Sequence, residues 1–429
     1  MLWRPAEILR HLAILAAVLL LVWGPRAIAA DIAIACSALG EEQEHCRAGA
    51  EAWAERTGNT VTLISTPGSA SEQLALYQQL LAAGADDIDV FQIDVVWPGI
   101  LARHFIDLSQ VAGDRPARHF DAIIDNNTVE GRLVAMPWFA DAGLLYYRQD
   151  LLEKHGRPVP ETWDELTETA RIVQEAERAD GNRDFWGYVW QGRAYEGLTT
   201  NALEWISSHG GGTFVDDDGD ITINNPAAAR ALERAAGWVG AISPPGVLNY
   251  TEEEARGVFQ SGQALFMRNW PYAWALAQGA DSPVRGRIGI AVLPRGGADG
   301  SHSAALGGQQ LAVSRYSAHP DLAADLVMHL TSRQEQKRRA IVGAFNPTIP
   351  ALYDDPDIAE ALPVIAELRD ILGHAVPRPS TVTGTAYNRV SATIVDAVHR
   401  VLSGQAEPQA ALDRLERDLT RIKRRGWRR

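Results

Sequence analysis

The chain has 429 residues, of which 46% are hydrophobic and 22% charged, and its formal net charge is −14 at pH 7. This length exceeds what one ordinary core holds and suits two domains, and the composition is typical of a folded globular protein. The acidic balance argues against a nucleic-acid binder, because such proteins carry a basic stripe, and the basic run at 421–429 is typical of a solvated helix end.

Residues 1–30 have the three zones of a secretory signal peptide. Two arginines precede an apolar run at 12–23, and small residues offer a cleavage site near Ala29 and Ala30. The apolar run falls short of the roughly 20 residues that span a bilayer as a helix. We therefore expect an exported, soluble protein that resides in the periplasm after cleavage.

Cys36 and Cys46 are the two cysteines of the chain. In an oxidising compartment a close pair is a disulfide candidate, and this one would fasten the first strand to the first helix across a short loop. The alternative makes Cys36 a lipid-anchored first residue, but the preceding Ala33-Ile34-Ala35 lacks the leucine that is usual in such sites.

The first third of the mature chain alternates strands with helices. Apolar patterning predicts strands at 32–36, 61–65 and 88–93, and helices at 44–57 and 72–83. This alternation favours an α/β architecture with a parallel sheet and crossover helices.

The rest of the chain continues with mixed elements. Strands are predicted at 132–137, 143–148, 264–267, 287–292 and 310–314, and helices at 164–179, 202–208, 226–239 and from 320 onward. The segment 214–223 is predicted to form a β-hairpin around Asp218-Gly219.

No motif for catalysis or cofactor binding is present. The chain contains no G-x-S-x-G, H-E-x-x-H, G-x-x-x-x-G-K-[ST] or G-x-G-x-x-G motif, and its 11 His show no metal-ligand spacing. We expect neither a metal nor a cofactor, and we expect a binding protein rather than an enzyme. Because glycosidases need only two carboxylates, a hydrolase remains an open alternative.

Six segments spread over the chain carry a combined pattern. They are DVFQIDVVWPG (89–99), GRLVAMPWFADAGLLYYRQDLL (131–152), AYEGLTTNALEWISSHGGG (194–212), FQSGQALFMRNWPYAW (259–274), LGGQQLAVSRYSAHPDLAADLV (306–327) and PRPSTVTGTAYNRVSATIVDAV (377–398). In this order they resemble the family 1 extracellular solute-binding proteins of ABC transporters, in the branch that binds maltose and trehalose.

The resemblance implies a two-lobed, type II periplasmic-binding-protein fold with a ligand cleft between the lobes. The chain would cross between the lobes three times, near 140–145, 306–310 and 346–348. One lobe would hold 31–140 plus 309–347, and the other would hold 141–308 plus 348–429. Such lobes close on their ligand by hinge motion.

The resemblance also implies the ligand contacts. A sugar site combines hydrogen-bonding groups at the ring edge with aromatic side chains beneath the ring. Asp94 follows a buried strand, where open α/β sheets bind ligands. Glu41 and Glu42 are adjacent, and the pattern does not distinguish which of them accepts hydrogen bonds from the ligand. The expected ligand-binding residues are Glu42, Asp94, Phe139, Asp141, Tyr195, Glu196, Trp270, Gly308, Gln309, Arg378 and Tyr387.

Gln309 departs from the pattern, because trehalose and maltose binders can carry a stacking Trp there. An amide both donates and accepts hydrogen bonds, so a different disaccharide, a glycoside or a polyol is the alternative to a maltose-like ligand.

The sequence therefore predicts a monomeric protein that captures a sugar and delivers it to the permease subunits of an ABC transporter. Three alternatives remain: an exported glycoside hydrolase that uses two of Glu42, Asp94 and Asp141, a receptor that signals to a membrane sensor, and a binder of a non-sugar solute.

Overall fold

The computed structural model describes residues 29–297 and 299–427. The predicted signal peptide, residues 1–30, lies outside the described residues except for its last two positions. Within the described part of the chain, no helix combines the length and apolarity needed to cross a membrane.

The first sheet is built around three parallel strands. β1 (Asp31–Ser37) lies between β2 (Thr60–Thr66) and β3 (Val90–Asp94), and β3 pairs antiparallel with β11 (Ala304–Val313). β11 also pairs with β6 (Met136–Ala142) and with the short β12 (Ala375–Val376). Every residue of β3 is buried, as its continuous apolar run predicts for a strand covered on both faces.

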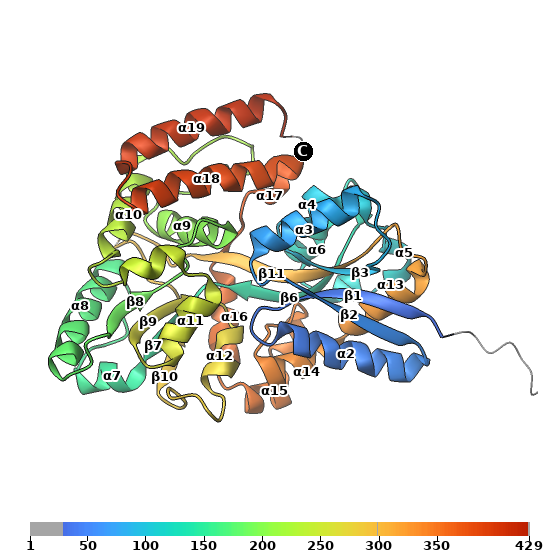
Figure 1. Ribbon diagram of the computed structural model, residues 1–429, viewed down its shortest axis with the longest axis horizontal. Coiled ribbons are helices and arrows are strands. Elements are labelled where there is room, and N and C mark those ends of the chain that lie inside the picture. The colour runs from blue at the N-terminus through green and yellow to red at the C-terminus, as the bar shows by residue number, and fades with distance from the viewer. Residues whose placement is uncertain (1–28, 298, 428–429) are drawn as a thin grey trace, which may run out of the picture.

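The second sheet has four strands in the order β10-β7-β9-β8. Their bounds are Ile288–Ala291, Leu144–Arg148, Ala264–Asn269 and Trp186–Val189. β9 pairs antiparallel with β7 and parallel with β8. The two sheets form the cores of two lobes that lie side by side (Figure 1).

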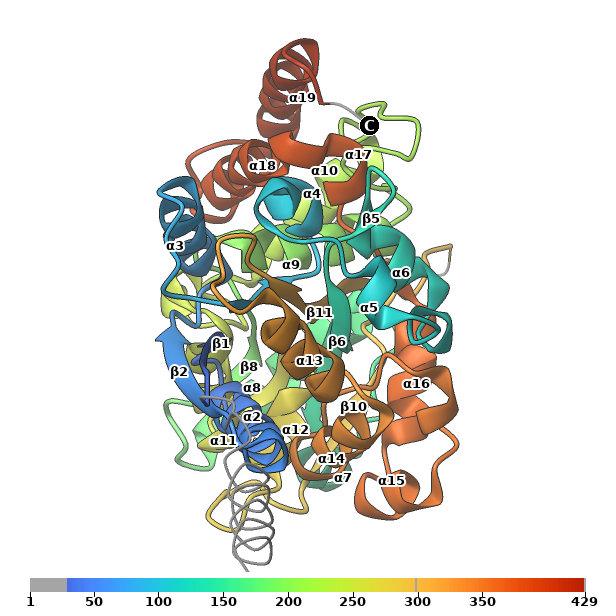
Figure 2. The same ribbon diagram turned by 90° about the vertical axis from the view of Figure 1, so that its right-hand side faces the viewer.

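Helices cover both sheets. In the first lobe, α2 (Glu42–Thr57) and α13 (Pro320–Leu330) pack together beside β2 and β11, while α3 (Ala70–Ala82) lies toward the second lobe (Figures 1 and 2). In the second lobe, α18 (Tyr387–Leu402) packs against α9 (Glu196–Ser208), α10 (Pro226–Trp238) and α19 (Pro408–Arg424).

The remaining helices are shorter or peripheral. They are α4 (Pro98–Leu101), α5 (Ser109–Ala112), α6 (Asp121–Asn127), α7 (Gln149–Lys154), α8 (Trp163–Ala179), α11 (Glu252–Gln260), α12 (Tyr272–Ala277), α14 (Arg333–Gly343), α15 (Pro356–Ala361), α16 (Ile365–Gly373) and α17 (Ser380–Thr383). Short 3-10 turns lie at Ala102–His104, Pro116–Arg118, Pro245–Asn249, Pro350–Leu352 and Gly384–Ala386, and β4 (Thr128–Val129) pairs with β5 (Arg132–Leu133).

Three chain passages between the lobes meet at Ala140. In β6, Ala140 pairs with Gly308 of β11 and also forms a bridge with Asn346. β6 ends at Ala142 in the first sheet and β7 begins at Leu144 in the second, so this passage is nearly direct. Ala140, Gly308 and Asn346 lie in the three segments where the sequence predicts crossings, and the lobe boundaries stay a prediction.

Gly308 permits the close approach of two of these passages. Its φ of +121° lies outside the range that L side chains adopt readily, and a Cβ there would lie 2.4 Å from the Phe139 carbonyl oxygen. Any side chain at this position would therefore push β6 and β11 apart.

Two sequence predictions differ from the structure in detail. The segment 214–223 turns back on itself around Asp218-Gly219 as predicted, with an antiparallel bridge between Val215 and Ile221. Neither arm extends into a strand, because Asp216 Oδ1 accepts the backbone N–H groups of Asp218 and Asp220 and closes a local turn. The helix predicted at 202–208 begins earlier, at Glu196. Nearly all its residues are buried, so it has no exposed polar face, and the alternation of polar and apolar residues that marks a helix in sequence is missing.

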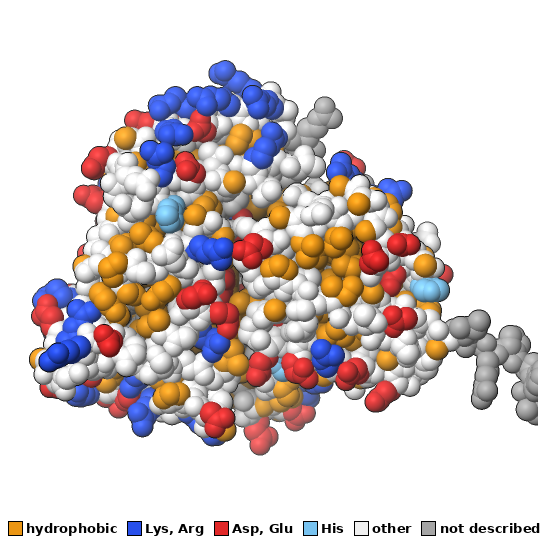
Figure 3. Space-filling view, in the orientation of Figure 1, with side chains coloured by type: hydrophobic (Ala, Val, Ile, Leu, Met, Phe, Trp, Pro, Cys, Tyr) orange, Lys and Arg blue, Asp and Glu red, His pale blue; other side chains and the backbone are white. Residues whose placement is uncertain are grey.

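Three basic side chains of the C-terminal helix are paired with carboxylates. Lys and Arg side chains gather over the α18–α19 end of the molecule (Figure 3). Arg414 and Arg421 both pair with Asp418, and Lys423 pairs with Asp220. These contacts agree with a solvated helix end, and the absence of nucleic-acid binding stays a prediction.

Cys36 and Cys46 form a disulfide between the end of β1 and the first turns of α2. Both residues are fully buried, and their Cα atoms lie 6.6 Å apart. The bridge closes the loop that carries Ser37, Leu39 and Glu42, which line a cavity between the two sheets.

Replacing both cysteines with alanine should lower the free energy of unfolding by about 3 kcal/mol, because the short loop then gains chain entropy in the unfolded state. Urea denaturation of the mature variant measures this difference. Dithiothreitol should reproduce the loss in the wild type and leave the variant unchanged. Equal stability of the two proteins under oxidising conditions would contradict the prediction.

Candidate functional site

A cavity of about 590 Å³ lies between the two sheets. Its walls are formed by the loops that follow β1, β3, β9 and β12, by the start of α9 and by the middle of β11. The lining residues are Ser37, Leu39, Glu42, Gly68, Ala70, Gln73, Asp94, Asp141, Glu196, Gly197, Thr200, Glu252, Trp270, Tyr272, Gly307, Gly308, Gln309 and Arg378. Both lobes therefore contribute to one pocket.

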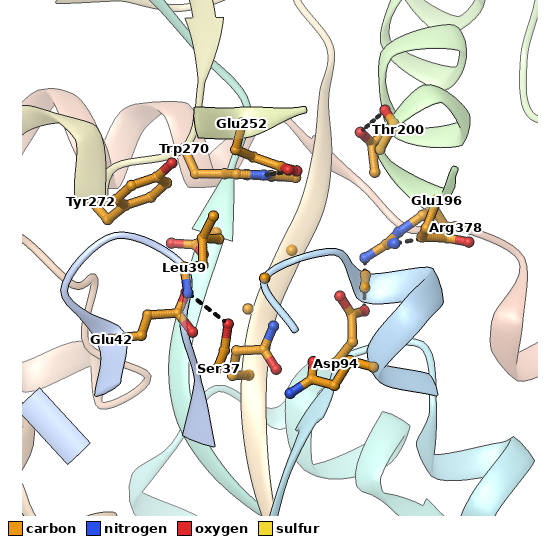
Figure 4. A pocket seen from close by; sticks show the side chains of 18 residues that line it. Ser37, Leu39, Glu42, Asp94, Glu196, Thr200, Glu252, Trp270, Tyr272 and Arg378 are labelled. Atoms are coloured by element: carbon orange, nitrogen blue, oxygen red, sulfur yellow. Dashed lines mark hydrogen bonds and ion pairs between the residues drawn. The ribbon is translucent and has the colours of Figure 1, made fainter. Parts of the chain in front are cut away.

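The structure brings eight of the expected ligand-binding residues into this lining. They are Glu42, Asp94, Asp141, Glu196, Trp270, Gly308, Gln309 and Arg378. Trp270 and Glu252 lie on one side of the pocket, Ser37 and Asp94 lie opposite, and Arg378 and Glu196 close a third side (Figure 4).

Arg378 joins the two lobes across the pocket. Its Nη1 donates to Glu196 Oε1 at 2.7 Å, and its Nη2 donates to Asp94 Oδ1 at 3.1 Å. Burial alone would lower the pKa of Arg378, but the neighbouring Asp94, Tyr387 and Glu196 outweigh it and raise that pKa. Among the described residues the buried Nε has no hydrogen-bond partner, so Arg378 retains one donor for a ligand or a water.

Asp94 is held in place by the turn after β3. Its Oδ1 also accepts the backbone N–H of Val96 at 3.0 Å, which is a local Asx turn. The strand end and this turn together fix the carboxylate at the edge of the pocket, where open α/β sheets place their ligand contacts.

Glu42 is a buried carboxyl group at the start of α2. The amide of Gln92 donates to its Oε2 at 2.7 Å. Burial, aided by the nearby Asp141 and Glu252, raises the pKa of Glu42 to about 8, although hydrogen bonds from Gln92 and Ser37 oppose the shift. Glu41 is instead exposed and lies near His45, so the structure separates the two candidates.

Asp141 is a second carboxyl group of the pocket with a raised pKa, and it has fewer hydrogen bonds than Glu42. Burial and the nearby Asp94 raise its pKa to about 7, and the more distant Arg268 opposes the shift only partly. Its carboxylate makes no side-chain hydrogen bond within the described part of the chain. A group of this kind favours a partner with several hydrogen-bonding groups.

Trp270 presents an aromatic plane to the pocket. Its indole Nε1 donates to Glu252 Oε1 at 3.3 Å, while Tyr195 donates to Glu252 Oε2 at 2.7 Å. A Cβ at Gly307 would lie 2.9 Å from the Trp270 ring, so this glycine admits the ring. An indole plane beside polar groups suits the apolar face of a sugar.

Three expected residues are absent from the lining. Phe139 packs in the core against Phe345, with ring centroids 4.8 Å apart. Tyr195 and Tyr387 are buried behind the pocket, where they donate to Glu252 and Glu196 respectively. These two tyrosines support carboxylates that line the pocket. A pattern of residue types does not distinguish this supporting role from direct contact with a ligand.

Several residues that line the cavity were not among those expected from the sequence. Glu252 stands first in a run of three glutamates that opens α11, and nothing in the sequence separates it from Glu253 and Glu254. Tyr272 lies only two residues beyond Trp270 in a segment that carries the family resemblance, so its position was the available signal. Thr200 lies in another such segment, 194–212, whereas Ser37, Leu39 and Gln73 have no such signal.

Most carboxyl groups of the pocket are held by separate partners. Gln92 engages Glu42, Arg378 engages Asp94 and Glu196, and Tyr195 and Trp270 engage Glu252, whereas Asp141 makes no side-chain hydrogen bond among the described residues. In residues 29–297 and 299–427, no group of three or more His, Cys, Asp or Glu could hold a metal ion. The absence of a metal stays a prediction.

The fold agrees with comparisons to known proteins. The family model described as bacterial extracellular solute-binding protein matches residues 41–337. A Deinococcus radiodurans protein described as a probable ABC transporter-binding protein is 52% identical over 404 residues, which cover 94% of this chain and 96% of that protein.

Solved structures are similar over nearly the whole chain. Maltose-bound T. maritima MalE3 matches with a TM-score of 0.87 and 38% identity, covering 92% of this chain and 100% of that one. A solute-binding protein from Agrobacterium vitis with bound D-mannitol matches with a TM-score of 0.79 over 92% of this chain and 99% of that one, and its 20% identity shows the fold alone.

These matches confirm the predicted two-lobed, type II periplasmic-binding-protein fold. The family match covers more than half of the chain, and the Deinococcus relative spans almost all of it. The chain belongs to the bacterial extracellular solute-binding proteins.

Proposed function

We propose that this protein is the substrate-binding component of an ABC transporter and that it captures a sugar or a polyol between its lobes. The observation that carries the proposal is the pocket itself, in which the Trp270 plane faces the Asp94–Arg378–Glu196 ion-pair network. An aromatic plane with charged hydrogen-bonding groups at its edge is the chemistry that a polyhydroxylated ring requires.

The similar proteins support the same ligand class. The T. maritima protein is solved with maltose and the A. vitis protein with D-mannitol. The name of the Deinococcus relative supports delivery to an ABC transporter. We infer that the mature protein is exported to the periplasm as a monomer and delivers its ligand to permease subunits in the inner membrane.

In this proposal the lobes are residues 31–140 plus 309–347 and residues 141–308 plus 348–429. Asp94 and Glu42 belong to the first lobe, while Glu196, Trp270 and Arg378 belong to the second. A sugar held by both sets stabilises the closed arrangement, because a ligand shifts a conformational equilibrium by its differential affinity for the two states.

Gln309 influences which ligands the pocket favours. Its Oε1 is buried and has no hydrogen-bond partner in the part of the chain that the structure describes, so the amide is available for a hydroxyl group of the ligand. An amide at this position favours an additional polar contact over a second stacking plane. Maltose, a related glycoside and a polyol are therefore the first ligands to test.

A thermal-shift screen of the mature protein against sugars, polyols and glycosides should give a clear rise in melting temperature with one group of related compounds. A ligand that binds the folded state with micromolar affinity adds about 4 kcal/mol of stability at millimolar concentration. Amino acids and polyamines serve as controls. Shifts with these compounds and with no sugar or polyol would overturn the proposed ligand class.

Trp270→Leu should weaken binding of the sugar found in that screen by about 30-fold or more, because buried aromatic anchors contribute about 2 kcal/mol or more to binding. Isothermal titration calorimetry measures the change. Trp186→Leu, at a half-buried tryptophan of the same lobe that does not line the pocket, is the matched control. Similar losses in both variants would contradict the stacking role.

Glu42→Gln should stabilise the ligand-free protein at high pH. Because burial raises the pKa of Glu42 from 4.5 to about 8, the folded state binds this proton more tightly than the unfolded chain. The free energy of unfolding therefore falls as pH rises between these two values, and glutamine removes that loss. Melting temperatures across this range should show a gain of about 2 °C or more at the alkaline end.

The same variant should show no such gain at pH values below 4.5, where Glu42 is protonated in both states. Glu41→Gln, at the neighbouring exposed position, is the control and should not gain stability with pH. A Glu42→Gln protein that is less stable than the wild type at alkaline pH would show that the ionised carboxylate stabilises the fold.

A further inference from the structure

A buried cation lies behind the aromatic plane of the pocket. The guanidinium carbon of Arg268 is 3.9 Å from the centroid of the Trp270 ring. Trp270 lines the pocket, whereas Arg268 is fully buried and does not. The cation therefore covers the ring face that is turned away from the ligand, and Figure 4 shows the ring along the wall of the pocket.

A buried ion pair fixes Arg268 in this position. Its Nε donates to Glu204 Oε2 at 2.9 Å, and its Nη2 donates to Glu204 Oε1, which also accepts the backbone N–H of Ala305 at 3.0 Å. Both side chains are 1% exposed. A two-point contact of this kind holds a planar guanidinium in one orientation.

The backbone is shaped around the ion pair. Gly143 lies in the passage between β6 and β7, and a Cβ there would lie 2.1 Å from Glu204 Oε1 and 2.7 Å from Arg268 Nη2. The pair also touches β11 through Ala305. The cation behind Trp270 is thus anchored to two of the three passages between the lobes.

The charge of Arg268 acts on a ligand mainly through the Trp270 ring. Glu204 balances this charge overall, while the guanidinium lies against the ring. In the pocket itself, Asp94 and Glu196 share Arg378, and Glu252 accepts hydrogen bonds from Tyr195 and Trp270. The raised pKa values of Glu42 and Asp141, about 8 and 7, keep these two groups partly protonated near neutral pH.

We propose that Arg268 is a specificity-determining positioning residue, which acts through Trp270 to make the pocket select uncharged sugars over cationic amino sugars. An aromatic ring attracts a cation through the electron density on its faces. With a cation already on one face, the other face repels a second cation, while the apolar face of a neutral sugar still stacks. This inference rests on the proposed function for its ligand class.

The test compares maltose with its 2-amino-2-deoxy derivative at a pH where the amine is protonated. The variant is Glu204→Leu/Arg268→Met, because a buried ion pair is replaced by apolar side chains with far less damage than the loss of one partner causes. Titration calorimetry of both ligands should show that the preference for the neutral sugar falls about 3- to 10-fold in the variant.

Two further variants separate charge from packing. Arg268→Lys keeps a cation behind the ring and should retain the wild-type preference. Arg178→Met removes a cation that lies 4.3 Å from the Trp186 ring, away from the pocket, and should also leave the preference unchanged. An unchanged preference in a folded Glu204→Leu/Arg268→Met protein would overturn the proposal.

A second measurement needs no sugar and so separates this inference from the proposed function. The fluorescence of Trp270 is obtained as the difference between each protein and its Trp270→Phe counterpart. In Glu204→Leu/Arg268→Met, quenching of Trp270 by Cs⁺ should rise relative to quenching by neutral acrylamide. Equal ratios in the wild type and the variant would refute the role of Arg268 even if neither protein binds maltose.

Discussion

The three passages of the chain between the lobes determine where everything else in this protein can lie. They meet at Ala140, which pairs with Gly308 on one side and bridges to Asn346 on the other. Gly308 allows the contact because it has no side chain to meet the Phe139 carbonyl. The pocket forms beside this meeting point, so the backbone that connects the lobes also supplies its floor through Gly307, Gly308 and Gln309.

The pocket is built at a cost to the fold. Glu42 and Asp141 have raised pKa values, chiefly because of lost solvation, which the hydrogen bond from Gln92 to Glu42 offsets only in part. Asp94 and Glu196 are in contrast satisfied by Arg378. In the proposed function, a polyhydroxylated ligand would supply hydrogen bonds to Glu42 and Asp141 and would join Asp94 and Glu196, so binding would offset the lost solvation.

The Trp270 side of the pocket is supported by residues behind the ring and at its edge. Trp270 touches the pocket, Arg268 lies behind it, and Glu204 holds Arg268 against Ala305 and Gly143. Glu252 and Tyr195 hold the indole from its edge. A ring held on its edge and on one face keeps its plane, which is the condition for stacking a sugar in one orientation.

The sequence alone determined the alternation of strands and helices in the first lobe, because period and burial are local properties: the run at 88–93 predicts the buried strand that ends at Asp94. It also determined the family and the order of the site segments, and hence eight of the lining residues. Tertiary structure alone decided which side chains of each segment reach the pocket. Phe139 turns into the core, Tyr387 lies behind Glu196, and Glu252 enters the lining from a run of three glutamates. The physical reason is that a residue type records what a side chain can do, while its direction depends on how helices and strands from distant parts of the chain pack around it.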